Sequence, residues 1–333
     1  MTQIPGTISV IICAFTEERW DATVAAIQSA HQQTLAPLEV ILVIDHNPAL
    51  LARARANISG IVAIENSQPK GLSGARNSGI AIAQGTFIAF LDDDAIAELD
   101  WLEKLYDRCR DPQVMGTGGA VDPLWLGPQP RWFPAEFYWV VGCTYRGLPE
   151  AFTTVRNLYG GCTCIRKEVF DIVGGFRVGI GRVGSIPKGC EETELCIRAR
   201  QRWPERVFLY EPAGRINHQI PPVRATWRYF RARCYGEGLS KAAIARFVGA
   251  KDGLSTERSY TLRTLPLGVW RGLGDGFVRR DPSGFARAAA IVGGLLTTTA
   301  GYLVGSIQQQ IEAWKNSSIK EQAIATASIK AEP

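Results

Sequence analysis

The stretch FLDDDA at residues 90–95 decides the fold of this chain, because an apolar run ends there in three consecutive carboxylates. Residues 86–91 predict a buried strand, and Asp92, Asp93 and Asp94 follow it directly. Acidic side chains at the end of such a strand lie where α/β proteins bind their ligands. Hard oxygen ligands there suit Mg²⁺ or Mn²⁺, which hold a diphosphate by bridging its oxygens. Taken alone, the triplet would favour a solvated acidic turn, so the interpretation depends on the rest of the chain.

The composition is that of a globular protein with room for one large α/β domain and an appendage: 333 residues, 46% hydrophobic and 21% charged. A net charge of +5 is only mildly basic, so we expect no nucleic-acid partner. The eight cysteines form no C-x-x-C pair, and the N-terminus lacks a basic region followed by an apolar one. These two features predict reduced thiols and a cytoplasmic protein. Because the chain has three histidines, we do not expect a multi-histidine zinc site.

The first hundred residues alternate between apolar runs and helical patterns. The predicted strands are residues 8–15, 38–44, 61–64 and 86–91, and the predicted helices are residues 16–33, 48–57 and 71–84. The runs ISVIICAF and LEVILVI are continuously apolar, which is typical of strands buried on both faces. The sequence therefore predicts an α/β fold, with a mostly parallel central sheet flanked by helices.

The second half of the chain is less regular. The predicted strands are residues 115–121, 159–165 and 207–211, and the predicted helices are residues 101–110, 166–173, 191–203 and 226–247. Gly236 and Gly238 are a candidate interruption of the last helix. Residues 123–147 are rich in Trp and Pro without a clear period, which predicts an ordered loop over a site.

Residues 288–307 carry no charge, and their length is sufficient to span a bilayer. Their moderate hydropathy fits a weak transmembrane or interfacial helix and a buried soluble helix equally well. We therefore expect three parts. They are an α/β domain at 5–220, a basic and aromatic helical extension at 221–285, and a helix at 286–333 that can associate with a membrane and ends in a polar tail.

Polar side chains gather where the predicted parallel strands end. They are found in AFTEE (14–18), DHN (45–47), the helix start GLSGARNSG (71–79) and DDD (92–94). An Asp just past a parallel strand can accept hydrogen bonds from a base or ribose, and a glycine-rich helix start that carries an Arg can hold phosphate. Each motif alone is weak, whereas the four in this order form a strong pattern.

With these motifs the sequence resembles the family 2 glycosyltransferases, which have the GT-A fold. The resemblance covers about residues 8–241. It rests on SVIICAFT (9–16), VIDHN (43–47), GLSGARNSG (71–79), FLDDD (90–94), the block GGCTCIRKEVF with GGF (160–176) and GCEETELC (189–196). It implies a nucleotide-sugar donor, a divalent metal, Mg²⁺ or Mn²⁺, and inversion at the anomeric carbon.

The resemblance also assigns expected roles to single residues. By motif, the residues that would line the nucleotide are Ala14, Phe15 and Glu17, and Asp45 would lie near the base. Arg76 would lie near the sugar or diphosphate. Asp92 and Asp93 would lie at the ribose or sugar. Asp94 would hold the metal. His218 is expected either to complete the metal or diphosphate site or to be a structural histidine. Cys13 and His46 depart from the usual pattern, and the second departure leaves the contacts of that loop open.

An inverting transfer needs one carboxylate to deprotonate the attacking hydroxyl. Glu191-Glu192 stands where Glu-Asp is usual, and position in the motif assigns the role to Glu192. Glu191 and Glu194 are the competing candidates. All three also fit a structural role, because acidic side chains at a helix N-terminus interact favourably with the helix dipole.

The residues after His218 point to the acceptor. Arg224, Arg228, Arg231 and Arg233 recur at helical spacing among aromatic residues, which fits a diphosphate or lipid-phosphate clamp and also fits a helix with its arginines in solvent. The segment RARCYGEGLSK (231–241) resembles one in bacterial and archaeal enzymes that glycosylate polyprenyl-phosphate-linked sugars. Residues 125–139 are expected to cover the acceptor, because aromatic faces pack well on sugar rings.

The sequence and its resemblance thus predict a metal-dependent inverting glycosyltransferase that moves a sugar from a nucleoside-diphosphate donor to a hydroxyl of a saccharide or polyprenyl-linked glycolipid. The resemblance favours a UDP-sugar as the donor, because UDP-sugars are the usual donors in that family. We expect it at the cytoplasmic face of the cell membrane, either peripheral or single-pass. A sugar-phosphate nucleotidyltransferase is an alternative, but it would normally have a basic loop after the first strand, where this chain has Glu17 and Glu18. A non-catalytic sugar-binding or partner-binding module is a second alternative, and the candidate metal and base residues argue against it.

Overall fold

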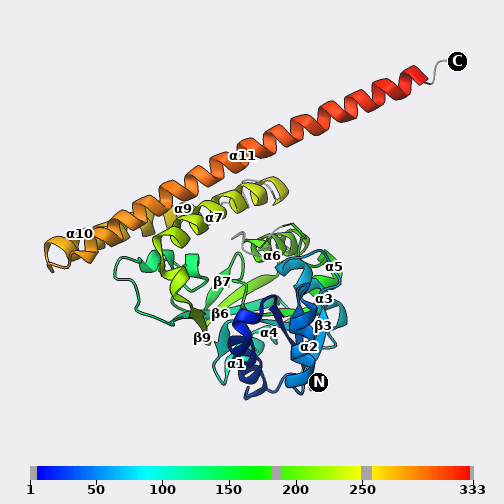
Figure 1. The fold of residues 1–333 in the computed structure, drawn as a ribbon, viewed down its shortest axis with the longest axis horizontal. Coiled ribbons are helices and arrows are strands. Elements are labelled where there is room, and N and C mark those ends of the chain that lie inside the picture. The colour runs from blue at the N-terminus through cyan, green and yellow to red at the C-terminus, as the bar shows by residue number, and fades with distance from the viewer. Residues whose placement is uncertain (1–5, 180, 182–188, 249–256, 331–333) are drawn as a thin grey trace.

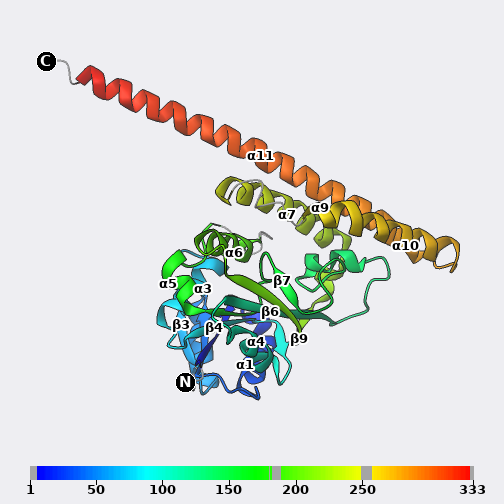
Figure 2. The same cartoon turned by 180° about the vertical axis from the view of Figure 1, so that it is seen from behind.

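The computed structural model describes residues 6–179, 181, 189–248 and 257–330. An α/β domain forms the body of the molecule, and long helices from the C-terminal third lie along one side of it (Figure 1). The last helix projects well beyond the α/β domain, as the reverse view also shows (Figure 2). The expected fold class, an α/β domain with a C-terminal helical extension, is therefore confirmed.

A single nine-stranded sheet forms the centre of the α/β domain. Its strands are β1 (Ile8–Ala14), β2 (Glu39–Ile44), β3 (Val62–Glu65), β4 (Phe87–Asp92), β5 (Ala95–Ala97), β6 (Val114–Trp125), β7 (Thr153–Val155), β8 (Cys162–Arg166) and β9 (Val207–Ile220). The order is β3-β2-β1-β4-β8-β6-β9-β5, and β7 pairs with β9. The neighbours β3, β2, β1 and β4 are parallel, as are β6 and β9, whereas β8 runs antiparallel between β4 and β6.

Helices cover both faces of the sheet (Figure 1). They are α1 (Trp20–His31), α2 (Pro48–Asn57), α3 (Leu72–Ile82), α4 (Trp101–Cys109), α5 (Lys167–Val173) and α6 (Glu191–Arg202), with short turns η1 (Glu17–Arg19), η2 (Ala135–Val141) and η3 (Pro222–Ala225). Val10 and Ile12 of β1 belong to one buried cluster together with Ile27 of α1. Ile11, between them, belongs to a second cluster together with Ala75 of α3. This two-sided burial explains why β1 is apolar without alternation.

The C-terminal third forms the helical extension. It comprises α7 (Trp227–Val248), α9 (Glu257–Ser259), the π-helical turn η4 (Tyr260–Thr264), α10 (Leu265–Phe277) and α11 (Ser283–Lys330). A Cβ atom at Gly238 of α7 would collide with the Thr298 carbonyl oxygen of α11, and one at Gly301 would collide with the Tyr235 carbonyl oxygen. The predicted interruption at Gly236 and Gly238 is wrong, because α7 is continuous. Gly238 instead lets the backbones of α7 and α11 come into contact.

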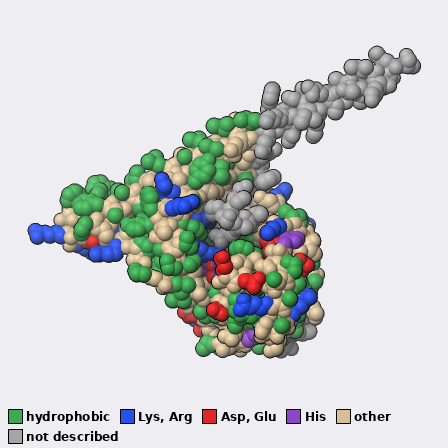
Figure 3. Space-filling model, in the orientation of Figure 1, with side chains coloured by type: hydrophobic (Ala, Val, Ile, Leu, Met, Phe, Trp, Pro, Cys, Tyr) green, Lys and Arg blue, Asp and Glu red, His purple; other side chains and the backbone are tan. Residues whose placement is uncertain are grey.

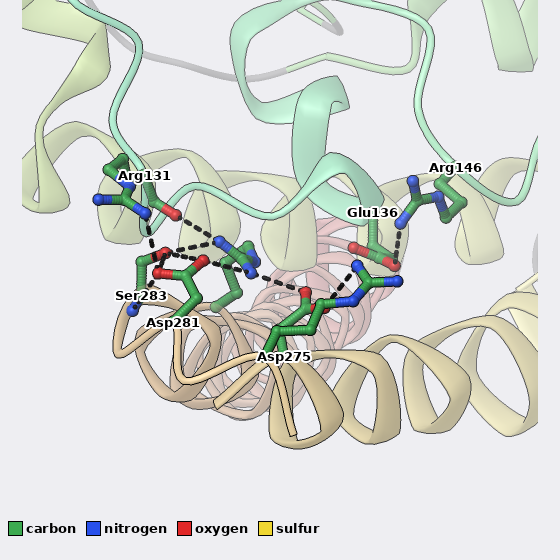
Figure 4. A network of polar contacts seen from close by, with 8 residues as sticks. Arg131, Glu136, Arg146, Asp275, Asp281 and Ser283 are labelled. Carbon is green, nitrogen blue, oxygen red and sulfur yellow. Dashed lines mark hydrogen bonds and ion pairs between the residues drawn. The ribbon is translucent and has the colours of Figure 1, made fainter. Parts of the chain in front are cut away.

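Aromatic and charged side chains join the extension to the α/β domain. Phe230 of α7 packs against Trp132, Phe133 and Phe137, with ring centroids 5.2–5.6 Å apart. Close by, Arg131 pairs with Asp281 at 2.9 Å (Figure 4). Glu136 of η2 pairs with Arg146 at 3.4 Å and Arg271 of α10 at 2.6 Å. The aromatic loop expected over a site is therefore ordered, and it holds the hairpin of α10 and α11.

Helix α11 is long and only partly covered. Among the described residues, the segment Ser283–Ile311 is long and apolar enough to cross a membrane. The mean hydropathy of its most apolar stretch is 1.5, and 28% of that stretch is buried. The low burial does not fit the helix of a soluble core, which was one of the two interpretations of residues 288–307. The division of the chain at residues 220 and 285 remains a prediction.

Candidate active site

A cavity of about 510 Å³ lies at the edge of the sheet where β1, β2, β4 and β9 end and β8 begins. Its walls come from the α/β domain at one end and from the helical extension at the other. The first group includes Cys13, Ala14, Phe15, Asp45, Arg76, Asp92, Asp93, Asp94, Glu191, Glu192 and His218, and the second includes Arg233, Glu237, Lys241, Ile244, Leu265, Leu295, Thr298 and Tyr302. The structure therefore brings nearly all of the predicted site residues into one cavity.

Asp92, Asp94 and His218 form a cluster whose candidate ligand atoms all lie within 4.8 Å of one another. The acidic triplet follows β4, and pairing of β5 with β9 sets Ala95 opposite His218. Imidazole Nε2 of His218 lies 2.9 Å from Asp94 Oδ1. Strand β5 is short and was not predicted, although it is the element that places the histidine beside the triplet.

Two arginines complete this end of the cavity. Arg224 Nη2 and Arg19 Nη1 each lie 3.1 Å from Asp94 Oδ2, and Arg19 Nη1 also donates to Asp93 Oδ1 at 2.8 Å. Burial would raise the pKa of Asp94, but His218, Arg224 and Arg19 outweigh it and leave the pKa below its ordinary value. Burial would lower the pKa of His218, but Asp94 raises it well above the ordinary value. The two side chains therefore form an ion pair, and a cation bound at this cluster would take the place of the proton on His218 Nε2.

The residues of this cluster fit a divalent cation. The two carboxylates are suitable ligands for both Mn²⁺ and Mg²⁺, and the imidazole favours Mn²⁺, because Mg²⁺ prefers oxygen ligands. Burial, with the charge of Asp94, raises the pKa of Asp93 to about 7. Asp93 Oδ2 is buried and finds no hydrogen-bond partner among the described residues. A buried carboxylate oxygen without a partner is costly, and a bound cation with its water shell would supply one.

Arg76 of α3 connects the two acidic groups of the cavity. Its side chain is 3% exposed, and its guanidinium carbon lies 5.3 Å from the ring centroid of Phe90 and 5.2 Å from that of Phe176. It contacts Glu192 Oε1 at 2.6 Å, Glu191 Oε1 at 3.3 Å and Asp92 Oδ1 at 3.7 Å. The acidic triplet and the glutamate pair, about a hundred positions apart in sequence, therefore face each other across one cleft.

The glycine pair that precedes β8 makes this close approach possible. A Cβ atom at Gly160 would collide with Glu192 Oε1, and one at Gly161 would collide with the carboxylate of Asp92. The backbone of the GGC motif thus passes directly beside both carboxylates. Because Gly160 and Gly161 have no side chains, both acidic groups fit in the same cavity.

The three glutamates of α6 occupy different environments. Burial, together with Glu192, raises the pKa of Glu191 to about 8, and Glu191 Oε2 has no hydrogen-bond partner within the described residues. Glu192 is 15% exposed and reaches the cavity. Glu194 is fully buried away from it, held by Arg177 at 3.1 Å and Arg198 at 2.7 Å. The geometry therefore separates Glu194 from its two neighbours.

The predicted nucleotide residues lie at the far end of the cavity from the extension. Ala14 is the last residue of β1 and Phe15 follows it, and Asp45 follows β2. Both oxygens of Asp45 hold the chain before α3: Oδ1 accepts from Asn66 Nδ2 at 2.7 Å and Oδ2 accepts from the Gly71 amide at 2.9 Å. Glu17 is not among the described residues that line the cavity, because the turn η1 leaves its side chain 48% exposed, 3.8 Å from Arg53.

The predicted acceptor residues divide between the cavity and the protein core. Phe137 and Trp139 line the cavity, whereas Trp125, Trp132 and Phe133 pack in the cluster that holds α7. Of the predicted arginine series, Arg224 and Arg233 line the cavity, and Arg228 and Arg231 are exposed. Arg19, Tyr260 and the contribution of α11 were not predicted from the sequence. The triplet carries three carboxylates, more negative charge than one divalent cation neutralises, and this excess was the signal that could have pointed to Arg19.

Comparison with known proteins agrees with this geometry. Residues 9–174 match the family model of glycosyl transferase family 2. The chain is 35% identical over 241 residues to the glucosyl-dolichyl phosphate glucuronosyltransferase of Haloferax volcanii, which covers 71% of this chain and 77% of that protein. It is 23% identical over 266 residues to the succinoglycan biosynthesis protein ExoM of Rhizobium meliloti, covering 74% of this chain and 82% of that protein.

Among solved structures, the fold is similar to that of GalNAc-T7 with UDP, GalNAc and Mn²⁺, with a TM-score of 0.50 and 16% sequence identity. The match covers 78% of this chain, which spans 57% of that structure. Fold, cavity and relatives together define a glycosyltransferase. The chain belongs to glycosyltransferase family 2. This membership favours glycosyl transfer over nucleotidyl transfer and over a non-catalytic binding module.

Proposed function

We propose that this enzyme is a metal-dependent inverting glycosyltransferase that moves a sugar from a UDP-sugar to a hydroxyl of a polyprenyl-linked glycolipid. One observation carries the proposal: a single cavity joins the Asp92, Asp94 and His218 cluster to the carboxylate of Glu192, with Arg76 between them. Donor-binding and hydroxyl-activating groups must face the same sugar, and this arrangement meets that requirement.

At the donor end, Ala14, Phe15 and Asp45 would contact the uridine, and Asp92, Asp94 and His218 would hold the cation. A bound divalent cation would neutralise the negative charge that develops on the leaving diphosphate. Arg19 and Arg224 place two guanidinium groups beside the same cluster, where they can also stabilise that charge. Both features favour departure of a nucleoside diphosphate.

At the acceptor end, Glu192 would accept the proton of the attacking hydroxyl. Glu191, with a pKa of about 8, holds its proton at neutral pH and is therefore less suited to that role. Direct attack by the activated hydroxyl displaces the diphosphate in one step and inverts the anomeric centre. Arg76 contacts both sides of the cleft and would orient the sugar between them.

Two observations favour a lipid-linked acceptor over a soluble saccharide. The first is the relative that acts on a glucosyl-dolichyl phosphate and aligns with most of this chain. The second is the apolar wall that the extension adds to the cavity, including Ile244, Leu265 and Leu295. A soluble saccharide would bury much less apolar surface against these side chains than a polyprenyl chain would.

The donor assignment predicts thermal protection that requires two components together. With UDP and Mn²⁺ both at about 100 times their dissociation constants, the midpoint of unfolding should rise by about 5 °C, and UDP alone should have a much smaller effect. The same preparation should hydrolyse a UDP-sugar slowly in the presence of Mn²⁺. Differential scanning fluorimetry and an assay for released UDP measure both. Release of pyrophosphate from UTP and a sugar phosphate would instead indicate nucleotidyl transfer.

We propose further that the protein acts at the cytoplasmic face of a membrane, held there by α10 and α11. Hydrophobic side chains gather over these helices, and Lys or Arg side chains mark the end of the hairpin (Figure 3). Trp270 and Phe277 are 72% and 73% exposed. On α11 the exposed side chains Val292, Leu296, Leu303, Ile307 and Ile311 recur at helical spacing and form one stripe. Arg279 and Arg280, between the two helices, suit anionic lipid headgroups.

This surface predicts a change in membrane affinity without a loss of folding. Replacing Trp270 and Phe277 together by serine should weaken binding to vesicles of anionic phospholipid by about 100-fold, because two aromatic side chains no longer leave water. Vesicle sedimentation measures the effect. The melting temperature should stay unchanged, because both side chains are exposed in the folded state. Equal sedimentation of the variant and the wild type would show that another surface holds the membrane.

A further inference from the structure

The face of α7 that borders the cavity carries charges spaced by four residues. Arg233, Glu237 and Lys241 all line the cavity. Glu237 lies between the other two, with Oε2 3.7 Å from Arg233 Nη2 and Oε1 3.5 Å from Lys241 Nζ. Burial would raise the pKa of Glu237, but Lys241 and Arg233 outweigh it and leave the pKa below its ordinary value. Glu237 therefore stays ionised and positions both cations.

This charged face lies against the start of α6, which carries the candidate base. Cys190 Sγ donates to Glu237 Oε1 at 3.3 Å, and the Gly189 amide donates to Ser240 Oγ at 3.2 Å. Glu191 and Glu192 follow immediately in sequence. The cations of α7 thus lie within the same end of the cavity as the carboxylate that would activate the acceptor, on the side away from the nucleotide residues.

Charge and polarity in this end of the cavity fit an anionic lipid. Arg156, Arg233 and Lys241 supply three cations, whereas Glu237 and Glu192 supply carboxylates. Ile244 of α7, Leu265 of α10 and Leu295 of α11 supply an apolar wall directly beside them. The donor diphosphate has its own cationic partners, Arg19 and Arg224, at the acidic triplet. The cations of α7 therefore suit a second phosphate.

We propose that Arg233 and Lys241 bind the phosphate of a lipid-linked acceptor, and that the adjoining wall between α7 and α11 binds the first units of its hydrocarbon tail. The inference rests on the proposed function, since the acceptor hydroxyl must reach Glu192. In this arrangement the sugar lies at α6, the phosphate at α7, and the tail runs along Ile244, Leu295 and Tyr302 toward the exposed stripe of α11. The helical extension thereby selects phosphate-linked acceptors.

A binding experiment on the full-length protein in detergent tests this site without requiring turnover. The three probes are farnesyl phosphate, farnesol and inorganic phosphate, and the method is isothermal titration calorimetry. Arg233→Gln and Lys241→Gln should each weaken farnesyl phosphate binding by about tenfold, the loss expected for one charge-assisted hydrogen bond. Farnesol should bind equally weakly to all variants, and inorganic phosphate should bind far more weakly than farnesyl phosphate.

Arg231→Gln is the matched control, because Arg231 lies on the same helix and is exposed. It should bind farnesyl phosphate like the wild type. Arg233→Lys should restore most of the affinity lost in Arg233→Gln, which separates loss of charge from misfolding. Equal affinity in the wild type, Arg233→Gln and Lys241→Gln would overturn the proposal. So would inorganic phosphate that binds as tightly as farnesyl phosphate, because the site would then serve a free anion.

Mn²⁺-dependent hydrolysis of a UDP-sugar separates this inference from the proposed function. Hydrolysis should be the same in the wild type and in Arg231→Gln, because Arg231 is exposed and does not line the cavity. Wild-type protein that binds farnesyl phosphate as expected but hydrolyses no nucleotide sugar would refute the proposed function and leave the phosphate site supported. Wild-type protein that hydrolyses the nucleotide sugar but binds farnesyl phosphate no more tightly than farnesol would refute the phosphate site and leave the proposed function supported.

Discussion

Replacing Glu192 by glutamine should lower the rate of sugar transfer by about 10²–10⁴-fold, the usual contribution of a general base. Glutamine has the same shape and can still accept a hydrogen bond from Arg76, so the cleft should keep its geometry. Binding of UDP and Mn²⁺ should stay close to that of the wild type. Steady-state assays with a lipid-linked acceptor, together with calorimetry of the donor, measure the two effects separately.

Glu191→Gln is the matched control for this prediction. Burial, together with Glu192, raises the pKa of Glu191 to about 8, so this side chain carries little charge at neutral pH, and replacing it by the neutral amide should affect transfer much less than the change at Glu192. The reverse order of effects would assign the base to Glu191. A Glu192→Gln variant that loses UDP binding as well as transfer would indicate that the side chain mainly positions Arg76.

Replacing Asp94 by asparagine should reduce transfer by about a thousandfold, because the enzyme would lose the charge that we propose holds a cation against the leaving diphosphate. Asp94 also holds His218, Arg224 and Arg19, so its loss should lower thermal stability when no ligand is present. Calorimetric titration of Mn²⁺ in the presence of UDP distinguishes the two effects. The variant should release no heat of metal binding at concentrations that saturate the wild type.

Removal of metal from the wild type gives an independent check on the Asp94 prediction. Excess EDTA should abolish transfer, and added Mn²⁺ should restore it. Asp94→Asn should keep its loss of about a thousandfold at any Mn²⁺ concentration. Wild-type activity that persists in EDTA would mean that the arginines alone stabilise the leaving group, and the cluster of Asp92, Asp94 and His218 would then be structural.

Local sequence patterns predicted the first half of the fold well. Continuous apolar runs identified β1, β2 and β4, because strands buried on both faces need apolar residues at every position. The carboxyl ends of parallel strands share one edge, so the residues after them were expected to meet, and Ala14, Asp45 and Asp92 do line one cavity. Their individual roles remain predictions.

Features that depend on long-range pairing were beyond the reach of these patterns. Strand β5 has three residues, too few to show a period, yet its pairing with β9 places His218 at Asp94. Arg19 looks like an ordinary surface residue in sequence, and its position follows from the turn η1. Thr16 was expected to begin a long helix, whereas it accepts from the Glu18 amide and α1 begins at Trp20.

The contact between α7 and α11 has a further consequence. Since the two backbones touch at Gly238 and Gly301, the helix that carries Arg233 and Lys241 must move together with the helix proposed to rest on lipid. If α11 rests on lipid as proposed, the distance between the catalytic cleft and the bilayer surface is then fixed. An acceptor sugar can reach Glu192 only if the length of its headgroup matches the distance from Glu192 to the bilayer. The membrane anchor would therefore select acceptors by the length of their headgroup.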